Sequence, residues 1–134
     1  MANSWLPKGR EHFALGEVDW VDDTIKAVFV DTDDHTPDDA NDESLADITG
    51  AARVDTTSAL TGQSATNGTL DAADTSVAGV TGDQFERVYV FKDSGVEATS
   101  WLLFYYDTAT GLPFTPAASG SDTNVTWPSP MAVL

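Results

Sequence analysis

Three short runs of β-branched and aromatic residues constrain the fold of this chain more than any other feature. They occupy residues 24–30, 85–91 and 100–106, and turn-forming residues lie close to their ends. Such runs are typical of strands, and the continuous apolar character of the first and third predicts burial on both faces of a sheet. In the middle run, strand alternation predicts two faces: one with Phe85, Arg87, Tyr89 and Phe91, the other with Val88 and Val90.

Weaker strand patterns follow one another at short spacing through the rest of the chain. They lie at residues 51–55, 59–60, 69–71, 76–80 and 124–127, with turn signals between them. No helical pattern of roughly 10–15 residues alternates with them, which argues against a parallel α/β fold. About seven to nine short strands indicate a mainly all-β fold, a single β-sandwich or barrel-like domain.

The length of the chain fits one domain with a short segment at each end. Its 134 residues lie within the usual domain size of about 100–150 residues. Residues 1–20 are predicted to form an N-terminal arm with a short helix, residues 21–127 the β-sandwich domain, and residues 128–134 a C-terminal tail. The sequence shows neither the apolar run of a secretory signal nor a stretch as long as a membrane span, so we expect a protein that is soluble where it is made.

The chain is strongly acidic, with 22 Asp and Glu against 6 Lys and Arg and a net charge of −16. Repulsion within such a protein acts over roughly 10 Å in dilute buffer but only about 3 Å near 1 M salt. The scarcity of Lys and the excess of Asp over Glu favour a halophilic protein. Because phosphates are bound by clustered cations that this chain lacks, neither nucleic acid nor membrane is expected as a partner.

Little in the sequence points to catalysis. There is no Cys, no nucleophile elbow and no phosphate-binding loop, and His12 and His35 are expected to be solvent-exposed. We therefore expect no enzyme, no catalytic residues and no cofactor. Residues 31–47 contain eight carboxylates and no Lys or Arg. A cation site at Asp31, Asp33 and Asp34 is one interpretation, but the calcium-loop pattern fails at its glycine position, which favours a solvent-facing acidic loop.

Apolar residues at the two chain ends are the better candidates for a binding surface. Trp5, Leu6 and Phe13 lie in the Pro- and Gly-bounded N-terminal arm, and the tail contributes Trp127, Met131 and Leu134. Buried aromatic anchors dominate the energetics of protein interfaces, so these six residues are predicted to contact another protein. The alternative is that both ends pack back onto their own domain.

The order of these patterns resembles a group of small proteins encoded among the head and tail genes of tailed viruses. The resemblance begins at Lys8-Gly9 with its short helix and ends with the strand at Trp127. Its motifs are strand and turn patterns that contain no catalytic residues. No single motif identifies the group, and the resemblance rests on the order in which they occur. They lie at residues 23–31, 45–48, 52–54, 59–62, 68–74, 80–86, 90–95 and 106–114. The chain departs from the group in the extra acid of residues 31–47 and in its Trp-rich ends.

The resemblance implies a virion structural protein that decorates or cements the capsid by binding the assembled shell. Its partners would be the major capsid protein or other virion proteins, together with further copies of itself, a trimer being favoured. It would lie on the particle surface after assembly in the host cytoplasm, and the acidity fits a tailed virus of a haloarchaeon. Two alternatives stay open: a host-recognition module of a head fibre, turret or tail that binds a glycan or receptor, and a tail or neck component.

The halophilic interpretation predicts that stability depends on salt. We expect the free energy of unfolding to fall as molar salt is dialysed away, because repulsion among the carboxylates is then no longer screened. Denaturant titrations followed by circular dichroism at several salt concentrations measure this dependence. Full stability at about 50 mM salt, where screening is weak, would contradict the interpretation.

Overall fold

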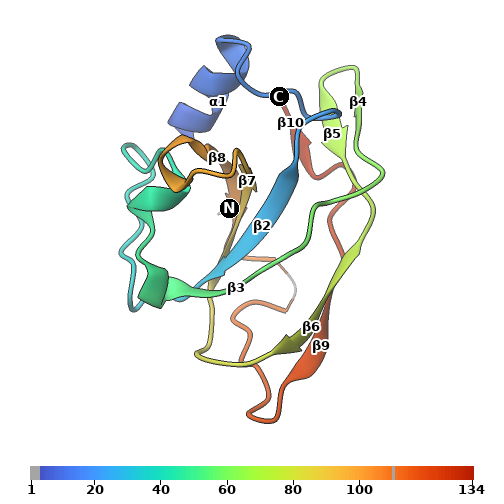
Figure 1. Ribbon diagram of the computed structural model, residues 1–134. Coiled ribbons are helices and arrows are strands. Elements are labelled where there is room, and N and C mark those ends of the chain that lie inside the picture. Colours follow the sequence, from blue (N-terminus) through green and yellow to red (C-terminus); the bar gives the residue numbers. More distant parts are fainter. Residues whose placement is uncertain (1–3, 110) are drawn as a thin grey trace.

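The computed structural model of the protein describes residues 4–109 and 111–134. Within these residues it has ten strands paired in antiparallel sheets, one α-helix and three short 3-10 helices (Figure 1). The prediction of a mainly β fold is therefore confirmed. In chain order the elements are β1 (Ser4–Trp5), α1 (Pro7–Ala14), β2 (Ile25–Val30), η1 (Leu45–Asp47), η2 (Gly50–Ala52), β3 (Arg53–Thr56), β4 (Ser64–Thr66), β5 (Thr69–Asp71), β6 (Thr75–Val80), β7 (Arg87–Lys92), η3 (Glu97–Thr99), β8 (Leu102–Tyr106), β9 (Ser121–Val125) and β10 (Ala132–Val133).

The largest sheet has five strands in the order β1-β8-β7-β2-β3. Its three central strands are the three apolar runs of the sequence. Strand β2 buries side chains on both faces, with Phe29 in one core cluster and Val28 and Val30 in the other. Strand β7 does the same, since Val88 and Val90 face the first cluster while Tyr89 and Phe91 face the second.

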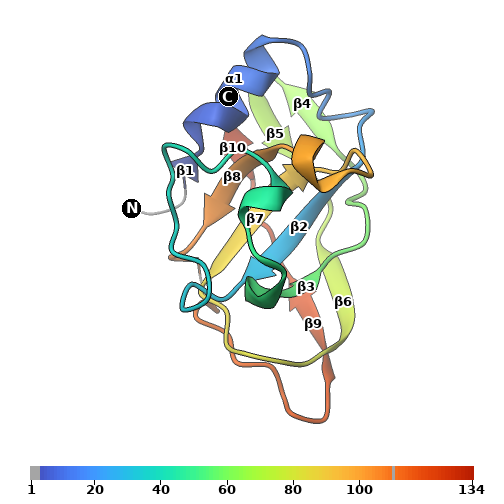
Figure 2. The same cartoon turned by 60° about the vertical axis from the view of Figure 1, so that its left-hand side comes forward.

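Different parts of the chain cover the two faces of this sheet. Two smaller sheets, β10-β5-β4 and β6-β9, contribute Leu70, Val77 and Val80 to the larger core cluster. On the opposite face, the segment with η1 and η2 contributes Ile48 and Ala52. Figures 1 and 2 show the β6–β9 ribbon at one end of the molecule and strands β4, β5 and β10 towards the other.

Both chain ends pack onto the domain. Strand β1 pairs with β8, and β10 pairs with β5, so each end satisfies backbone groups that an open sheet edge would leave unpaired. Residues of both predicted end segments therefore pair with strands of the sheets. Residues 1–3 of the predicted arm lie outside the described residues.

Helix α1 is fixed by its ends and by a glycine in its middle. Pro7 suits the first helical position because its missing N–H would have no helical partner there. At the other end Gly16 has a φ of 75°, and the N–H groups of Gly16 and Glu17 donate to the carbonyls of Phe13 and His12 at 3.1 and 3.0 Å, which is a Schellman motif. No helix of the described chain is long and apolar enough to cross a lipid bilayer.

Gly9 allows α1 to lie directly on strand β8. A Cβ atom at Gly9 would stand 2.3 Å from the Leu103 carbonyl oxygen and 2.7 Å from the Leu103 Cα, both of them backbone atoms. The helix and the strand therefore touch at a place where no larger residue fits.

We expect Gly9→Ala to lower the free energy of unfolding by about 1–3 kcal/mol, because the helix must move off the strand. The higher helix propensity of Ala, worth up to about 1 kcal/mol, works against this loss. Gly50→Ala is the control, since its Cβ would meet nothing within 4 Å. Denaturant unfolding of both variants measures the difference, and a Gly9→Ala protein as stable as wild type would contradict the close packing of α1.

Candidate functional site

The two chain ends meet in a surface groove, here called the terminal groove. It has a volume of about 300 Å³ and lies between residues 4–5, the end of β8 and residues 128–133. The Trp5 indole N–H donates to the Val133 carbonyl at 2.7 Å, and the Tyr106 hydroxyl donates to the Met131 carbonyl at 2.7 Å. These bonds hold the C-terminal segment against the sheet, so the groove is a formed feature of the fold.

The structure distributes the six predicted interface residues unequally. Leu6 is completely buried, and Trp127 and Met131 belong to the larger core cluster. Trp5 and Phe13 are half-buried and contact each other edge-on, with ring centroids 5.5 Å apart. Leu134 remains 54% exposed and the neighbouring Val133 57% exposed. Leu6, Trp127 and Met131 are thus buried in the protein's own core, which leaves Trp5, Phe13, Val133 and Leu134 as the accessible apolar residues among these.

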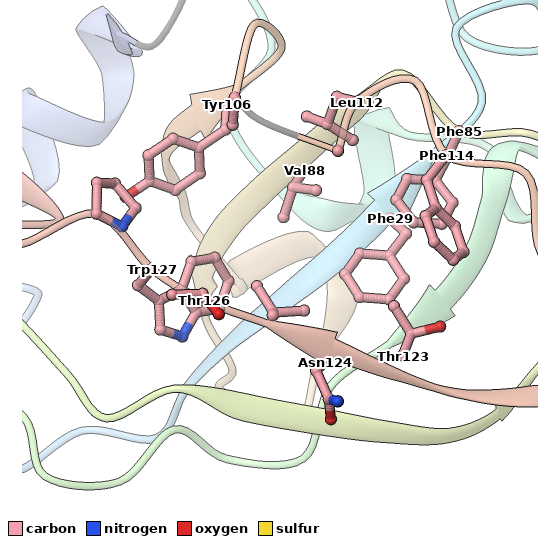
Figure 3. A pocket seen from close by; sticks show the side chains of 14 residues that line it. Phe29, Phe85, Val88, Tyr106, Leu112, Phe114, Thr123, Asn124, Thr126 and Trp127 are labelled. Atoms are coloured by element: carbon pink, nitrogen blue, oxygen red, sulfur yellow. The ribbon is translucent and has the colours of Figure 1, made fainter.

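A second hollow, here called the aromatic pocket, adjoins the terminal groove (Figure 3). Its volume is about 210 Å³, and it shares Tyr106 and Pro128 with the groove. Phe29 and Phe85 stack with centroids 4.5 Å apart, and Phe114 lies 5.3 Å from Phe85. The backbone N–H of Phe85 and that of Phe114 each donate to the other residue's carbonyl at 2.9 Å, which fixes this wall.

Among the described residues, the lining of the aromatic pocket carries no ionised side chain. Burial raises the pKa of Tyr106 far above its ordinary range, and the nearby carboxylate of Asp71 adds to the shift. Tyr106 therefore stays a neutral donor and is already used by Met131. The indole N–H of Trp127 is buried without an acceptor among the described residues. Such a lining can bind apolar groups, with Thr123 and Asn124 offering polar contacts beside them.

Sequence reasoning named Trp5 and Met131, which line the groove, and Trp127, which lines the pocket, as interface residues, but it did not predict the pocket itself. The pocket residues come from β2, β7, β9 and the loop after β8, which are far apart in the sequence. A usable signal was present in Phe85 and Trp127, two aromatic residues at the ends of predicted strands.

Both histidines are buried, so the prediction that they are exposed is wrong. His12 is 5% exposed and stacks on Trp101 with centroids 3.8 Å apart. Its two ring nitrogens face carboxylates of Glu17 and Glu43. His35 is 8% exposed, and its Nε2 lies 2.9 Å from an Asp42 carboxylate oxygen. The abundant acid of the chain supplies each imidazole with a carboxylate partner, and neither ring lines the groove or the pocket.

Each Lys and Arg of the chain has an intramolecular contact. Arg87 is buried on β7, donates to Asp39 at 2.6 Å and to Asp107 at 3.1 Å, and lies 3.8 Å above the Tyr105 ring. Arg53 donates to the carbonyls of Leu45 and Ile48 and to Glu97. The other four pairs are Lys8 with Glu11, Lys26 with Asp93, Lys92 with Asp23, and Arg10 above the ring of Trp5.

Three carboxylates gather where the acidic loop meets the turn before β7. Oxygens of Asp31, Asp34 and Asp83 all lie within 4.8 Å of one another. Two of these residues belong to the predicted set, whereas Asp33 is not a member and its backbone N–H donates to the Asp31 carboxylate at 2.9 Å. Calcium takes about six to eight oxygen ligands, so the three carboxylates could supply part of such a set.

Comparison with known proteins adds no relative. The chain matches no protein-family model, and no curated protein sequence is significantly similar to it.

Repulsion within the carboxylate cluster is expected to lower the free energy of unfolding, and to do so more in dilute buffer than at high salt. We expect Asp34→Asn to raise the free energy of unfolding in dilute buffer by less than about 1 kcal/mol, because it removes like-charge repulsion at an exposed position. At about 1 M salt the gain should largely vanish, because the screening length is then only roughly 3 Å. Denaturant titrations of wild type and variant at both salt concentrations measure it.

Asp22→Asn is the matched control, because it makes the same change in net charge at an exposed residue outside the cluster. An equal gain from both variants would mean that the overall charge, and not the cluster, carries the cost. Calcium addition is a further arm of the same titration: ion binding would stabilise wild type more than Asp34→Asn.

Proposed function

We propose that this protein is a virion structural protein that decorates or cements the capsid of a tailed virus by binding the assembled shell. The observation that carries the proposal is the terminal groove, where residues near both chain ends lie together and Val133 is exposed beside the half-buried Trp5. The exposed Leu134 follows Val133 in the chain. Apolar residues around a preformed hollow are typical of protein-binding surfaces. For the fold, we propose that the two smaller sheets and the five-stranded sheet together form a β-sandwich.

The proposed protein would stabilise the capsid through its binding equilibrium with the shell. A protein that binds the assembled shell, and not the free subunits, stabilises the shell by mass action. We propose the major capsid protein or a neighbouring virion protein as its partner, and a symmetric homo-oligomer, a trimer in the simplest case, as its state on the particle surface. The resemblance of the sequence motifs to those of small head and tail proteins supports this assignment, and the acidity supports a halophilic host.

The aromatic pocket favours a second candidate, a host-recognition module of a head fibre, turret or tail. Aromatic walls with Thr123 and Asn124 beside them could hold a glycan ring as well as an amino-acid side chain. The two functions differ in the number of copies that a particle needs.

The copy number on purified virions separates these functions. A decoration protein should be present in roughly tens to hundreds of copies, because a symmetric shell repeats each binding position many times. Quantitative gel analysis against the major capsid protein measures this number. A count of about a dozen or fewer would contradict a decoration role and favour a tail, neck or host-recognition component.

The contact surface is tested by rebinding. Virions stripped of the chain are incubated with wild type or with the double variant Val133→Ser, Leu134→Ser, and bound protein is measured after sedimentation. We expect the double variant to bind about tenfold more weakly or worse, equivalent to about 1.4 kcal/mol. Val96→Ser is the control, since Val96 is 59% exposed and lies outside the groove. Unchanged rebinding of the double variant would exclude the terminal groove as the contact.

A further inference from the structure

Strand β9 has a partner on one side only. In the described part of the chain it pairs with β6 and with no other strand. Residues 123–126, which belong to β9 and the residue after it, line the aromatic pocket. Figure 3 shows β9 running past the pocket, with Phe29, Val88 and Leu112 gathered beside it. An open strand edge next to an apolar hollow is the arrangement that strand addition uses: backbone bonds provide affinity and the hollow receives a side chain.

The size of the pocket restricts what it can receive. Its volume of about 210 Å³ is below the roughly 300–1,000 Å³ of sites that enclose drug-sized ligands. A single large apolar side chain suits this space, and one such anchor in a central pocket can dominate the energy of a protein interface. Phe29, Phe85 and Phe114 offer ring faces and edges for an aromatic anchor.

Charge restricts the chemistry of the segment that carries this anchor. Asp122 is exposed on β9, and the Asp74 carboxylate accepts the backbone N–H of Trp127 at 3.0 Å beside the pocket. The net charge is −16, and the Lys and Arg residues all have intramolecular contacts. A docking segment therefore gains from Lys or Arg on either side of its anchor and is disfavoured by acid.

We propose that the aromatic pocket and the outer edge of β9 together receive an extended segment of a partner protein, with one large apolar side chain in the pocket and Lys or Arg residues flanking it. This inference rests on the proposed function in that the partner is a protein of the particle. It adds a second contact, next to the terminal groove, and the kind of sequence that fits it.

The test uses the full chain and a fluorescently labelled probe peptide, KKTVFVTKK, with blocked ends. Binding is followed by fluorescence anisotropy, and contact with β9 by the backbone amide shifts of residues 121–126 in NMR spectra. We expect the peptide to bind and to shift these amides. A peptide with Ala in place of Phe, and one with Glu in place of every Lys, should each bind at least about tenfold more weakly.

Two pairs of protein variants locate the contact. Ala109→Phe fills the pocket, and Ala118→Phe places the same side chain at an exposed residue outside it. Asp122→Lys reverses a charge on β9, and Asp22→Lys makes the same change elsewhere. The first member of each pair should lose at least about fivefold in affinity, and the second should bind like wild type apart from a small general charge effect. If Ala109→Phe fails to fold, the comparison of Asp122→Lys with Asp22→Lys still tests whether the peptide contacts β9.

The proposal is overturned if the Phe peptide does not bind at millimolar concentration, if the Ala peptide binds as well, or if the β9 amides do not shift. It is also overturned if mono- or disaccharides from a glycan panel shift these amides while the peptides do not, which would favour glycan recognition. These outcomes are independent of the virion copy number. A high copy number with failed peptide binding would refute this inference alone, whereas a low copy number with successful binding would refute the decoration role alone.

Discussion

The fold depends on a central sheet that must be covered on both faces. Strands β2, β7 and β8 are apolar on each side, so exposing either face would leave large side chains such as Phe29 or Tyr89 in water. At roughly 25 cal/mol per Å² of apolar surface, that burial is the main source of stability available to a chain without disulfides. The two smaller sheets cover one face of this sheet, and the segment with η1 and η2 covers the other.

The acidic loop of residues 31–47 belongs to the segment that covers the Tyr89 face of the sheet, and this position explains why the loop is ordered. The loop was expected to face solvent, and many of its carboxylates do, but Asp31, His35 and Asp42 are buried. Two cations attach the loop to the sheet. Arg87 reaches Asp39 from β7, and Arg53 binds the carbonyls of Leu45 and Ile48 from β3. Burial of the Arg87 guanidinium opposes its charge, but Tyr89 and Asp39 outweigh that cost and its pKa is raised. Two of the six cations of the chain therefore lie where this loop is held against the sheet.

The sequence predicted the central strands because two-sided burial leaves a continuous apolar pattern that needs no knowledge of the partners. It predicted the faces of Val88, Val90, Tyr89 and Phe91 correctly because successive side chains of a strand point to opposite faces. Phe85 was placed on the wrong face, since β7 begins only at Arg87 and Phe85 instead pairs with Phe114. The positions of Leu6, Trp127 and Met131 could not be predicted. Short apolar segments beside prolines show no periodicity, and only the open edges of β8 and β5 decide where they pack.

The location of the groove and the pocket depends on how the Phe29 face of the five-stranded sheet is covered. Two separate small sheets cover this face. Sheets β10-β5-β4 and β6-β9 are not paired with each other, so the covering layer is split along a line that residues 126–131 cross on their way from β9 to β10. Trp127 and Met131 fill this split from within, which is why they belong to the core. The terminal groove and the aromatic pocket share Tyr106 and Pro128, two residues at the split. A sheet with one continuous cover would have no hollow there, and a wider split would expose the core. The division into two small sheets thus leaves apolar surface exposed at the groove and the pocket while the core stays closed.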